Sequence, residues 1–151
     1  MTTVYDVPPD LLISVVAEEL KKSKKVNPPE WAPFVKTGVH REKSPIDRGW
    51  WYTRVAAVFR KVYVRGPVGT ERLSAEFGGR RDRGSAPYHP RKGSRSIVRE
   101  CLNQLEDLGY LKKADTRGRV VTPKGQSYLD NKAHEILTSL SKERPELAKY
   151  A

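Results

Sequence analysis

One stretch, residues 50–65 (WWYTRVAAVFRKVYVR), constrains the fold more than any other, because it is the longest apolar-rich periodic run in the chain. At 100° per residue, most of its apolar side chains fall in one broad arc, so the spacing predicts an amphipathic helix that anchors a core. The arc consists of Trp51, Tyr52, Val55, Ala56, Val58, Phe59, Val62 and Tyr63. The opposite side carries a stripe of Arg54, Lys61 and Arg65, with Arg60 beside it. From this helix alone, an anion-binding face and an ordinary solvated face are equally open.

The excess positive charge is concentrated in the middle of the chain. The 151 residues have a net charge of +11, and residues 50–99 contain twelve Lys and Arg against three Asp and Glu. A strongly basic balance indicates a polyanion or an anionic membrane surface as partner. The concentration favours a specific anion-binding surface over a uniformly basic shell.

Several classes of function find no support in the sequence. Cys101 is the only cysteine, which excludes an intramolecular disulfide and suggests a reducing compartment, and it belongs to an apolar helical stripe typical of core packing. No apolar run is long enough to cross a bilayer. His40, His89 and His134 are scattered, and no metal-ligand spacing or nucleotide-binding glycine pattern occurs. We therefore expect a cytoplasmic protein that is not an enzyme and has no metal, cofactor or membrane partner.

The other elements follow from spacing and capping residues. The pattern predicts helices over 6–20, 70–77 and 95–108, a β-hairpin from 110–113 and 119–122, and a last helix that begins at Pro123. This order is typical of a winged helix-turn-helix. We therefore predict a mainly α fold, a helical domain over 5–141 around the central helix, with a winged-helix-like unit at about 50–140, one short β-hairpin and a polar tail at 142–151. In the recognition position, Arg95, Ser96, Arg99 and Asn103 share a face.

One segment departs from that motif. Residues 78–93 (GGRRDRGSAPYHPRKG) stand where a helix-turn-helix has only three or four residues, and their four Gly and two Pro predict an irregular loop. Arginine forks match phosphate oxygens, and planar side chains can stack on unpaired bases, so we expect RNA in preference to duplex DNA. A flexible solvated loop is the alternative. The loop residues expected to bind are Arg80, Arg81, Arg83, Arg91 and Lys92, with Tyr88 and His89 as stacking candidates.

Four segments together resemble a known family. They are PPEWAPFVKTGVHRE, WWYTR with the following Val64-Arg65-Gly66 step, FGGRRDRGSAPYHPRKGSRSIVRECLNQLEDLGYL and GRVVTPKGQSYLD. In this order they resemble the archaeal and eukaryotic small-subunit ribosomal protein family S19e, from near residue 5 to about 140.

The resemblance implies a mainly helical, non-enzymatic protein in the head of the small ribosomal subunit. It would contact small-subunit ribosomal RNA and neighbouring ribosomal proteins, and support precursor rRNA maturation and subunit assembly. Family RNA contacts map onto Arg54, Arg60 and Arg65, then Arg80, Arg81 and residues 91–95. We expect a monomer when free. The alternative is a winged-helix regulator of duplex DNA, which predicts a dimer and a short turn; the basic insertion argues against it.

Overall fold

The computed structural model describes residues 2–150, with side chains to residue 147, and its helices dominate this part. The five α-helices in the described part are α1 (Pro9–Ser23), α2 (Trp50–Arg65), α3 (Thr70–Glu76), α4 (Arg95–Asp107) and α5 (Pro123–Glu143). Short 3-10 turns lie at Val4–Asp6, Ala32–Phe34 and Pro145–Tyr150. The strands are β1 (Gly79–Arg83), β2 (Ala86–Arg91), β3 (Leu111–Lys113) and β4 (Arg119–Val121). The predicted mainly α class is confirmed.

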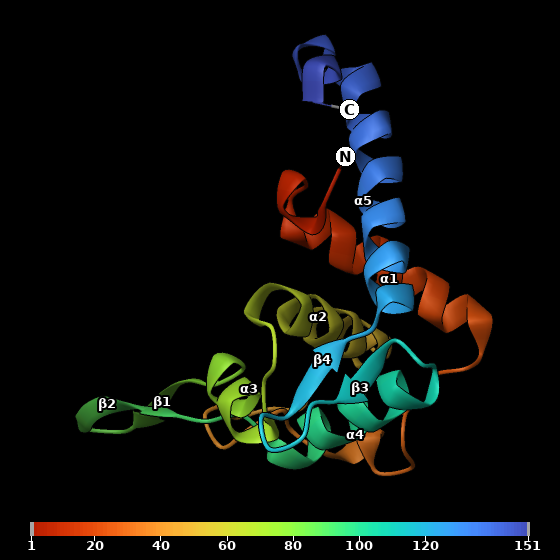
Figure 1. Ribbon diagram of the computed structural model, residues 1–151. Helices are drawn as coiled ribbons and strands as arrows, with labels where there is room; N and C mark the ends of the chain where they lie inside the picture. Colours follow the sequence, from red (N-terminus) through yellow and green to blue (C-terminus); the bar gives the residue numbers. More distant parts are fainter. Residues whose placement is uncertain (1, 151) are drawn as a thin grey trace.

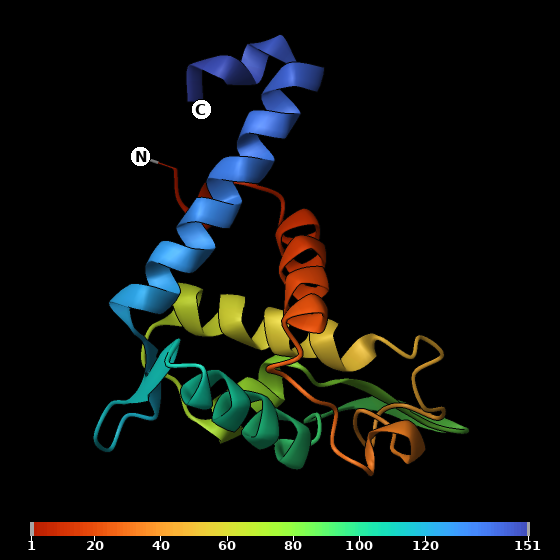
Figure 2. The ribbon, with the colours of Figure 1, turned by 90° about the vertical axis from the view of Figure 1, so that its right-hand side faces the viewer.

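Helix α2 lies at the centre of the molecule and has the bounds that its periodicity predicts. Helices α1 and α5 lie on one side of it, and α4 with the β3–β4 hairpin lies on the other (Figures 1 and 2). Its buried residues are Trp51, Val55, Ala56, Val58, Phe59 and Val62, while Tyr52 and Tyr63 of the predicted arc are half-buried. Complete burial of a side chain such as Phe59 contributes about 1.5–3 kcal/mol, so this face organises the core.

Three aromatic rings connect α2 with the C-terminal elements. The Phe59 ring stacks on Tyr110 at 5.3 Å between centroids, and Tyr110 stacks on Tyr128 of α5 at 4.9 Å. Tyr110 immediately precedes β3, so one stack joins the central helix, the hairpin and the last helix. Such pairs contribute about 0.5–1.5 kcal/mol beyond area burial.

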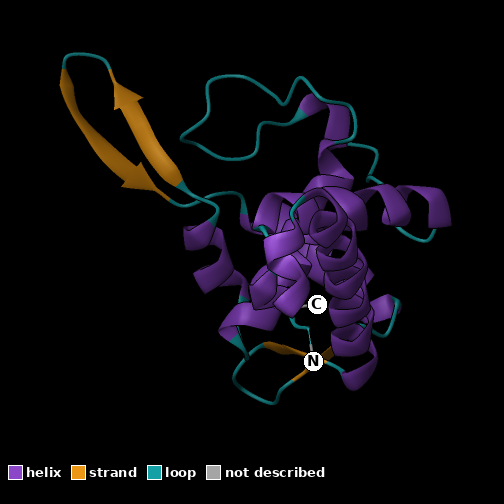
Figure 3. Ribbon diagram, turned by 90° about the horizontal axis from the view of Figure 1, so that it is seen from above, coloured by secondary structure: helices purple, strands orange, loops and turns teal. Residues whose placement is uncertain are grey.

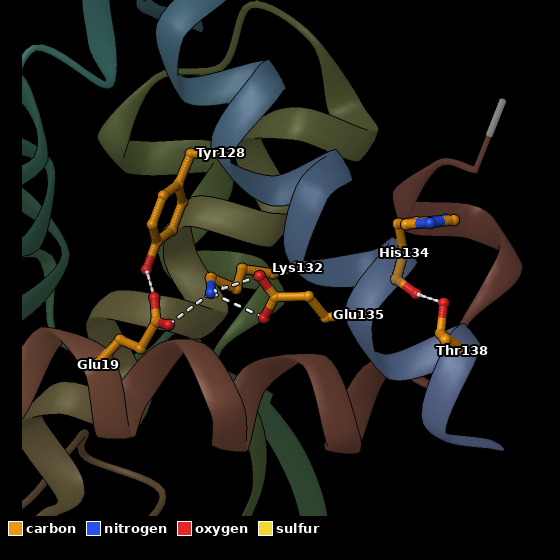
Figure 4. Close-up of polar contacts among 6 residues, drawn as sticks. All are labelled: Glu19, Tyr128, Lys132, His134, Glu135 and Thr138. Carbon is orange, nitrogen blue, oxygen red and sulfur yellow. Dashed lines mark hydrogen bonds and ion pairs between the residues drawn. The ribbon is translucent and has the colours of Figure 1, made fainter. Parts of the chain in front are cut away.

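The first and last helices are connected by polar contacts. Glu19 of α1 accepts hydrogen bonds from Tyr128 (2.6 Å) and Lys132 (2.6 Å) of α5, and Lys132 also pairs with Glu135 (Figure 4). Nearby, the Thr138 hydroxyl donates to the His134 carbonyl. The contacts of Glu19 hold together two helices that are far apart in the sequence. We call Glu19, Tyr128 and Lys132 the α1–α5 clasp.

The prediction of an irregular loop at 78–93, and of one hairpin in all, is wrong. Strands β1 and β2 pair antiparallel from Gly79↔Arg91 to Arg83↔Ala86, with a register shift between Arg81 and Arg83. The resulting β1–β2 hairpin projects from the helical body (Figures 1 and 3). Glycine and proline content predicted irregularity, but Gly84 supplies the left-handed turn residue (φ 69°) and the prolines occupy positions in edge strands, where a missing amide is tolerated.

The predicted wing hairpin is confirmed and is tied to the recognition helix. Backbone hydrogen bonds of 3.0 Å in both directions join Val68 to Arg119 of β4. The Arg119 side chain donates to Asn103 (3.0 Å) and pairs with Glu106 (3.3 Å), both on α4. Asn103 is therefore engaged by the wing instead of being free on the face that we predicted for nucleic acid.

Candidate nucleic-acid interface

The β1–β2 hairpin is almost wholly exposed, and neither of its faces covers a core. Every residue from Arg80 to Arg91 except the half-buried Ala86 is exposed. A two-stranded hairpin without a covering layer is marginally stable in water. Its base is anchored where the chain passes close to itself: a Cβ on Gly78 would lie 2.3 Å from the Arg91 carbonyl oxygen, and one on Gly93 2.7 Å from that of Phe77. A side chain at either position would collide with the backbone, so these two glycines allow the chain to pass close to itself.

Strand alternation separates the predicted stacking residues onto different faces. Arg80 and Tyr88 share one face, where the Arg80 guanidinium lies 5.5 Å from the centroid of the Tyr88 ring. Arg81 is paired with His89 in the register, so both point to the other face. There, Arg91 donates a 3.0 Å hydrogen bond to Nδ1 of His89. The two faces of the hairpin therefore both combine arginine with a planar ring.

Two cations of the central stripe are neutralised by one carboxylate. Lys61 (2.9 Å) and Arg65 (2.8 Å) both pair with Glu76 of α3. The hydrogen bond from Lys61 holds the pKa of Glu76 below its usual value, with a further contribution from Arg65. Glu76 is therefore charged at neutral pH, and both cations already have an anionic partner.

A second carboxylate neutralises two more of the predicted cations, beside the start of α4. Lys92 and Arg95 (3.3 Å) both pair with Glu71 of α3. The hydrogen bond from Lys92 lowers the pKa of Glu71, so this carboxylate is also charged at neutral pH. Of the residues predicted to bind RNA, four are thus engaged in surface ion pairs, which contribute only about 0–1 kcal/mol each to stability.

The remaining predicted arginines have no ion-pair partner among residues 2–147. They are Arg54, Arg60, Arg80, Arg81, Arg83, Arg91 and Arg99, and we call them the unpaired arginines. Arg54 is half-buried, with its guanidinium 4.5 Å from the centroid of the Phe77 ring, and burial lowers its pKa. The buried Nε of Arg60 finds no hydrogen-bond partner in the described protein. Arg99 is exposed on α4.

Arg54, Arg80 and Tyr88 meet at a groove that the sequence did not reveal. Its volume is about 1050 Å³, and the segment before α2 contributes a wall that includes His40, Arg41 and Lys43. Residues 35–49 contain four Lys and Arg against two Asp and Glu, so this segment stands out less by composition than residues 78–93. Sequence periodicity carries no signal for it, since it contains no helix or strand between Val35 and Gly49.

The described part of the chain shows neither a metal-binding cluster nor a membrane-spanning helix. Residues 2–147 contain no His, Cys, Asp and Glu cluster able to hold a metal, and no described helix is long and apolar enough to span a membrane. Cys101 is fully buried, and burial raises the pKa of its thiol. This agrees with the packing role predicted for it.

Comparison with known proteins identifies the family. The family model described as "Ribosomal protein S19e" matches residues 3–139. The chain belongs to the ribosomal protein S19e family. This agrees with the resemblance seen in the sequence. S19e proteins are structural constituents of the small ribosomal subunit and not enzymes.

Curated relatives of this S19e chain include proteins from archaea and fission yeast. Proteins named small ribosomal subunit protein eS19 are 47% identical over 150 residues in Thermoplasma acidophilum and 49% identical over 152 residues in Aeropyrum pernix, each alignment covering 99% of both chains. The eS19B protein of Schizosaccharomyces pombe is 42% identical over 135 residues, which is 89% of this chain and 94% of the relative. Family membership and the engaged Asn103 together favour the ribosomal interpretation over a DNA regulator.

Proposed function

We propose that this S19e chain binds small-subunit ribosomal RNA in the head of the subunit, next to neighbouring ribosomal proteins, and supports maturation of precursor rRNA and subunit assembly. The observation that carries the proposal is the exposed β1–β2 hairpin, which holds Arg80, Arg81, Arg83 and Arg91 without ion-pair partners in the described part. A hairpin with no core behind it gains stability when a partner covers it.

The mechanism is electrostatic positioning. Each unpaired arginine that reaches a phosphate neutralises it and releases counterions, so the affinity falls steeply with salt. The arginine fork presents parallel donors to phosphate oxygens and fixes orientation as well as charge. The chain contributes no catalytic step, and we expect it to be a monomer when it is free of the subunit.

Charge reversal on the hairpin tests the proposal. In filter binding with transcribed archaeal small-subunit rRNA, we expect R81E/R83E to weaken binding by about tenfold or more, because two phosphate contacts become repulsive. The matched control K21E/K25E reverses two exposed lysines around the end of α1 and should bind within about twofold of wild type, as expected for sites that do not contact RNA. Equal losses in both variants, or none in R81E/R83E, would refute the hairpin as the RNA-binding element.

A reconstitution assay addresses the assembly role. Small subunits rebuilt with R81E/R83E should lack the protein after a high-salt wash, while the K21E/K25E control should be retained. Circular dichroism of both variants must show an unchanged melting temperature, because these four side chains are exposed. Normal retention of R81E/R83E would contradict a role of the β1–β2 hairpin in subunit assembly.

A further inference from the structure

A groove runs between the β1–β2 hairpin, the first turns of α2 and the segment that precedes α2. Figures 2 and 3 show this segment beside the hairpin. The groove has a volume of about 1050 Å³, and its lining includes Arg41, Trp50, Arg54, Arg80 and Tyr88. The volume is large enough for one nucleotide and its sugar-phosphate.

The walls of the groove are fixed to each other at the base. The backbone of Ser94 donates to the Thr37 carbonyl (3.0 Å), and Gly38 forms a β-bridge with Gly93. The His40 ring fills the space above two glycines: a Cβ on Gly38 would lie 2.7 Å from its Nδ1, and one on Gly79 3.0 Å from its Cδ2. The groove is therefore already formed before a ligand binds, which lowers the conformational entropy lost on binding.

The charges that line the groove favour an anion. Arg41, Lys43, Arg54 and Arg80 form no ion pair among residues 2–147. Two of the three acids in the lining are engaged locally: Asp47 accepts from the Gly49 amide and Asp82 from the Gly84 amide, both at 2.8 Å. None of the three carboxylates, including Glu42, lies within ion-pair distance of these cations, in contrast to Glu71 and Glu76, which each pair with two.

The lining also offers a surface for a flat ring. The Tyr88 side chain is 62% exposed and has Arg80 close to its face, an arrangement that extends a stacking platform. A phosphate and a planar base occur together in a nucleotide.

We propose that the groove binds one unpaired nucleotide of the ribosomal RNA, with its base stacked on Tyr88 and its phosphate held by Arg54 and Arg80. The inference rests on the proposed RNA-binding function and makes it specific: the groove selects unpaired over double-stranded RNA. A base inside a duplex is stacked on its neighbours and cannot enter, whereas bases in loops and bulges can. A peptide of a neighbouring protein is the competing occupant.

The test compares hexaadenylate with a short blunt RNA duplex by fluorescence anisotropy at one salt concentration. We expect Y88A to weaken hexaadenylate binding by about tenfold, because stacking on an aromatic ring is lost. Y88F keeps the ring and should bind within about twofold of wild type. The control F34A removes another exposed aromatic, 86% exposed and outside the groove lining, and should change nothing. Duplex binding should be equal in all four proteins.

The outcomes separate this inference from the proposed function. Unchanged hexaadenylate binding by Y88A, or an equal loss for strand and duplex, would overturn the groove while R81E/R83E can still support rRNA binding through the hairpin. Full affinity of Y88A for hexaadenylate and rRNA, combined with its loss from reconstituted subunits, would assign the groove to a neighbouring protein and also overturn the inference. Absence of rRNA binding by the wild-type chain would refute the proposed function itself.

Discussion

At Glu71 and Glu76, two carboxylates of α3 engage four of the cations that the sequence marks as RNA-binding. A cation with a carboxylate partner must exchange that partner before it can bind a phosphate. Until then, the positive potential of the cation and the negative potential of the carboxylate partly cancel. The unpaired arginines have no such competition within residues 2–147. At the scale of single residues, we therefore expect ion pairing with a carboxylate, and not charge alone, to decide which cations contact RNA.

This difference predicts unequal salt dependence for two single substitutions. R81A removes an unpaired arginine of the hairpin, so the slope of log affinity for rRNA against log salt should become shallower by about 0.7–0.9. K61A removes a cation paired with Glu76, which keeps Arg65, so its effect on the slope should be clearly smaller. Affinities measured over a salt series give both slopes. Equal changes would show that ion pairing does not screen these cations.

At the scale of elements, the β1–β2 hairpin depends on close backbone contacts at its base more than on side-chain packing. Gly78 connects α3 to β1, and its Cα faces the Arg91 carbonyl of β2. No side chain fits there without a backbone shift. The sequence correctly predicted a break in the helices between α3 and α4, but it did not predict that the residues there pair as two strands. Glycine and proline content indicates turns but not how the flanking residues pair.

Two glycine substitutions test the anchoring of the hairpin. G78A places a Cβ 2.3 Å from the Arg91 carbonyl oxygen, and we expect a loss of about 1–3 kcal/mol in the free energy of unfolding, as for other overpacked sites. G69A is the control: its Cβ meets nothing within 4 Å and its φ of −91° suits alanine, so the loss should be limited to the poorer N-cap of α3 and stay below about 1 kcal/mol. Urea denaturation measures both, and a stable G78A would contradict the close contact.

At the scale of the whole molecule, the α1–α5 clasp joins the two ends of the chain outside the apolar core. Burial alone would raise the pKa of Glu19, but the hydrogen bonds from Lys132 and Tyr128 outweigh it and leave the pKa below its usual value. A carboxylate with a lowered pKa stabilises the fold fully above its unfolded pKa, and this contribution is lost as the pH falls through the folded-state value.

The clasp therefore predicts a pH-dependent stability difference. E19Q should reduce the free energy of unfolding by about 1 kcal/mol at pH 7, because charge-assisted hydrogen bonds become neutral ones. The difference from wild type should shrink below about pH 4.5, where Glu19 takes up a proton in the unfolded state. E18Q changes the adjacent exposed carboxyl and serves as control. A difference that is constant from pH 7 to pH 3 would exclude the clasp as its origin.

The sequence by itself determined the helices, the wing and the region of excess charge. Periodicity predicted α2 from Trp50 to Arg65, and Ser94 and Thr122 mark the starts of α4 and α5 by their capping hydrogen bonds. These features are local: they depend on spacing and on side chains within one turn. Family resemblance in the same segments indicates a ribosomal protein without reference to any tertiary contact.

Only the tertiary structure decided which basic residues are available and where they meet. Glu76 reaches Lys61 and Arg65 across the α2–α3 turn, and the groove brings His40, Arg54 and Tyr88 together from three separate segments. Such contacts join residues with no fixed spacing along the chain, so no periodicity records them. The physical reason is that a helical pattern specifies which face is buried, whereas the packing of one element on another specifies which charges are paired.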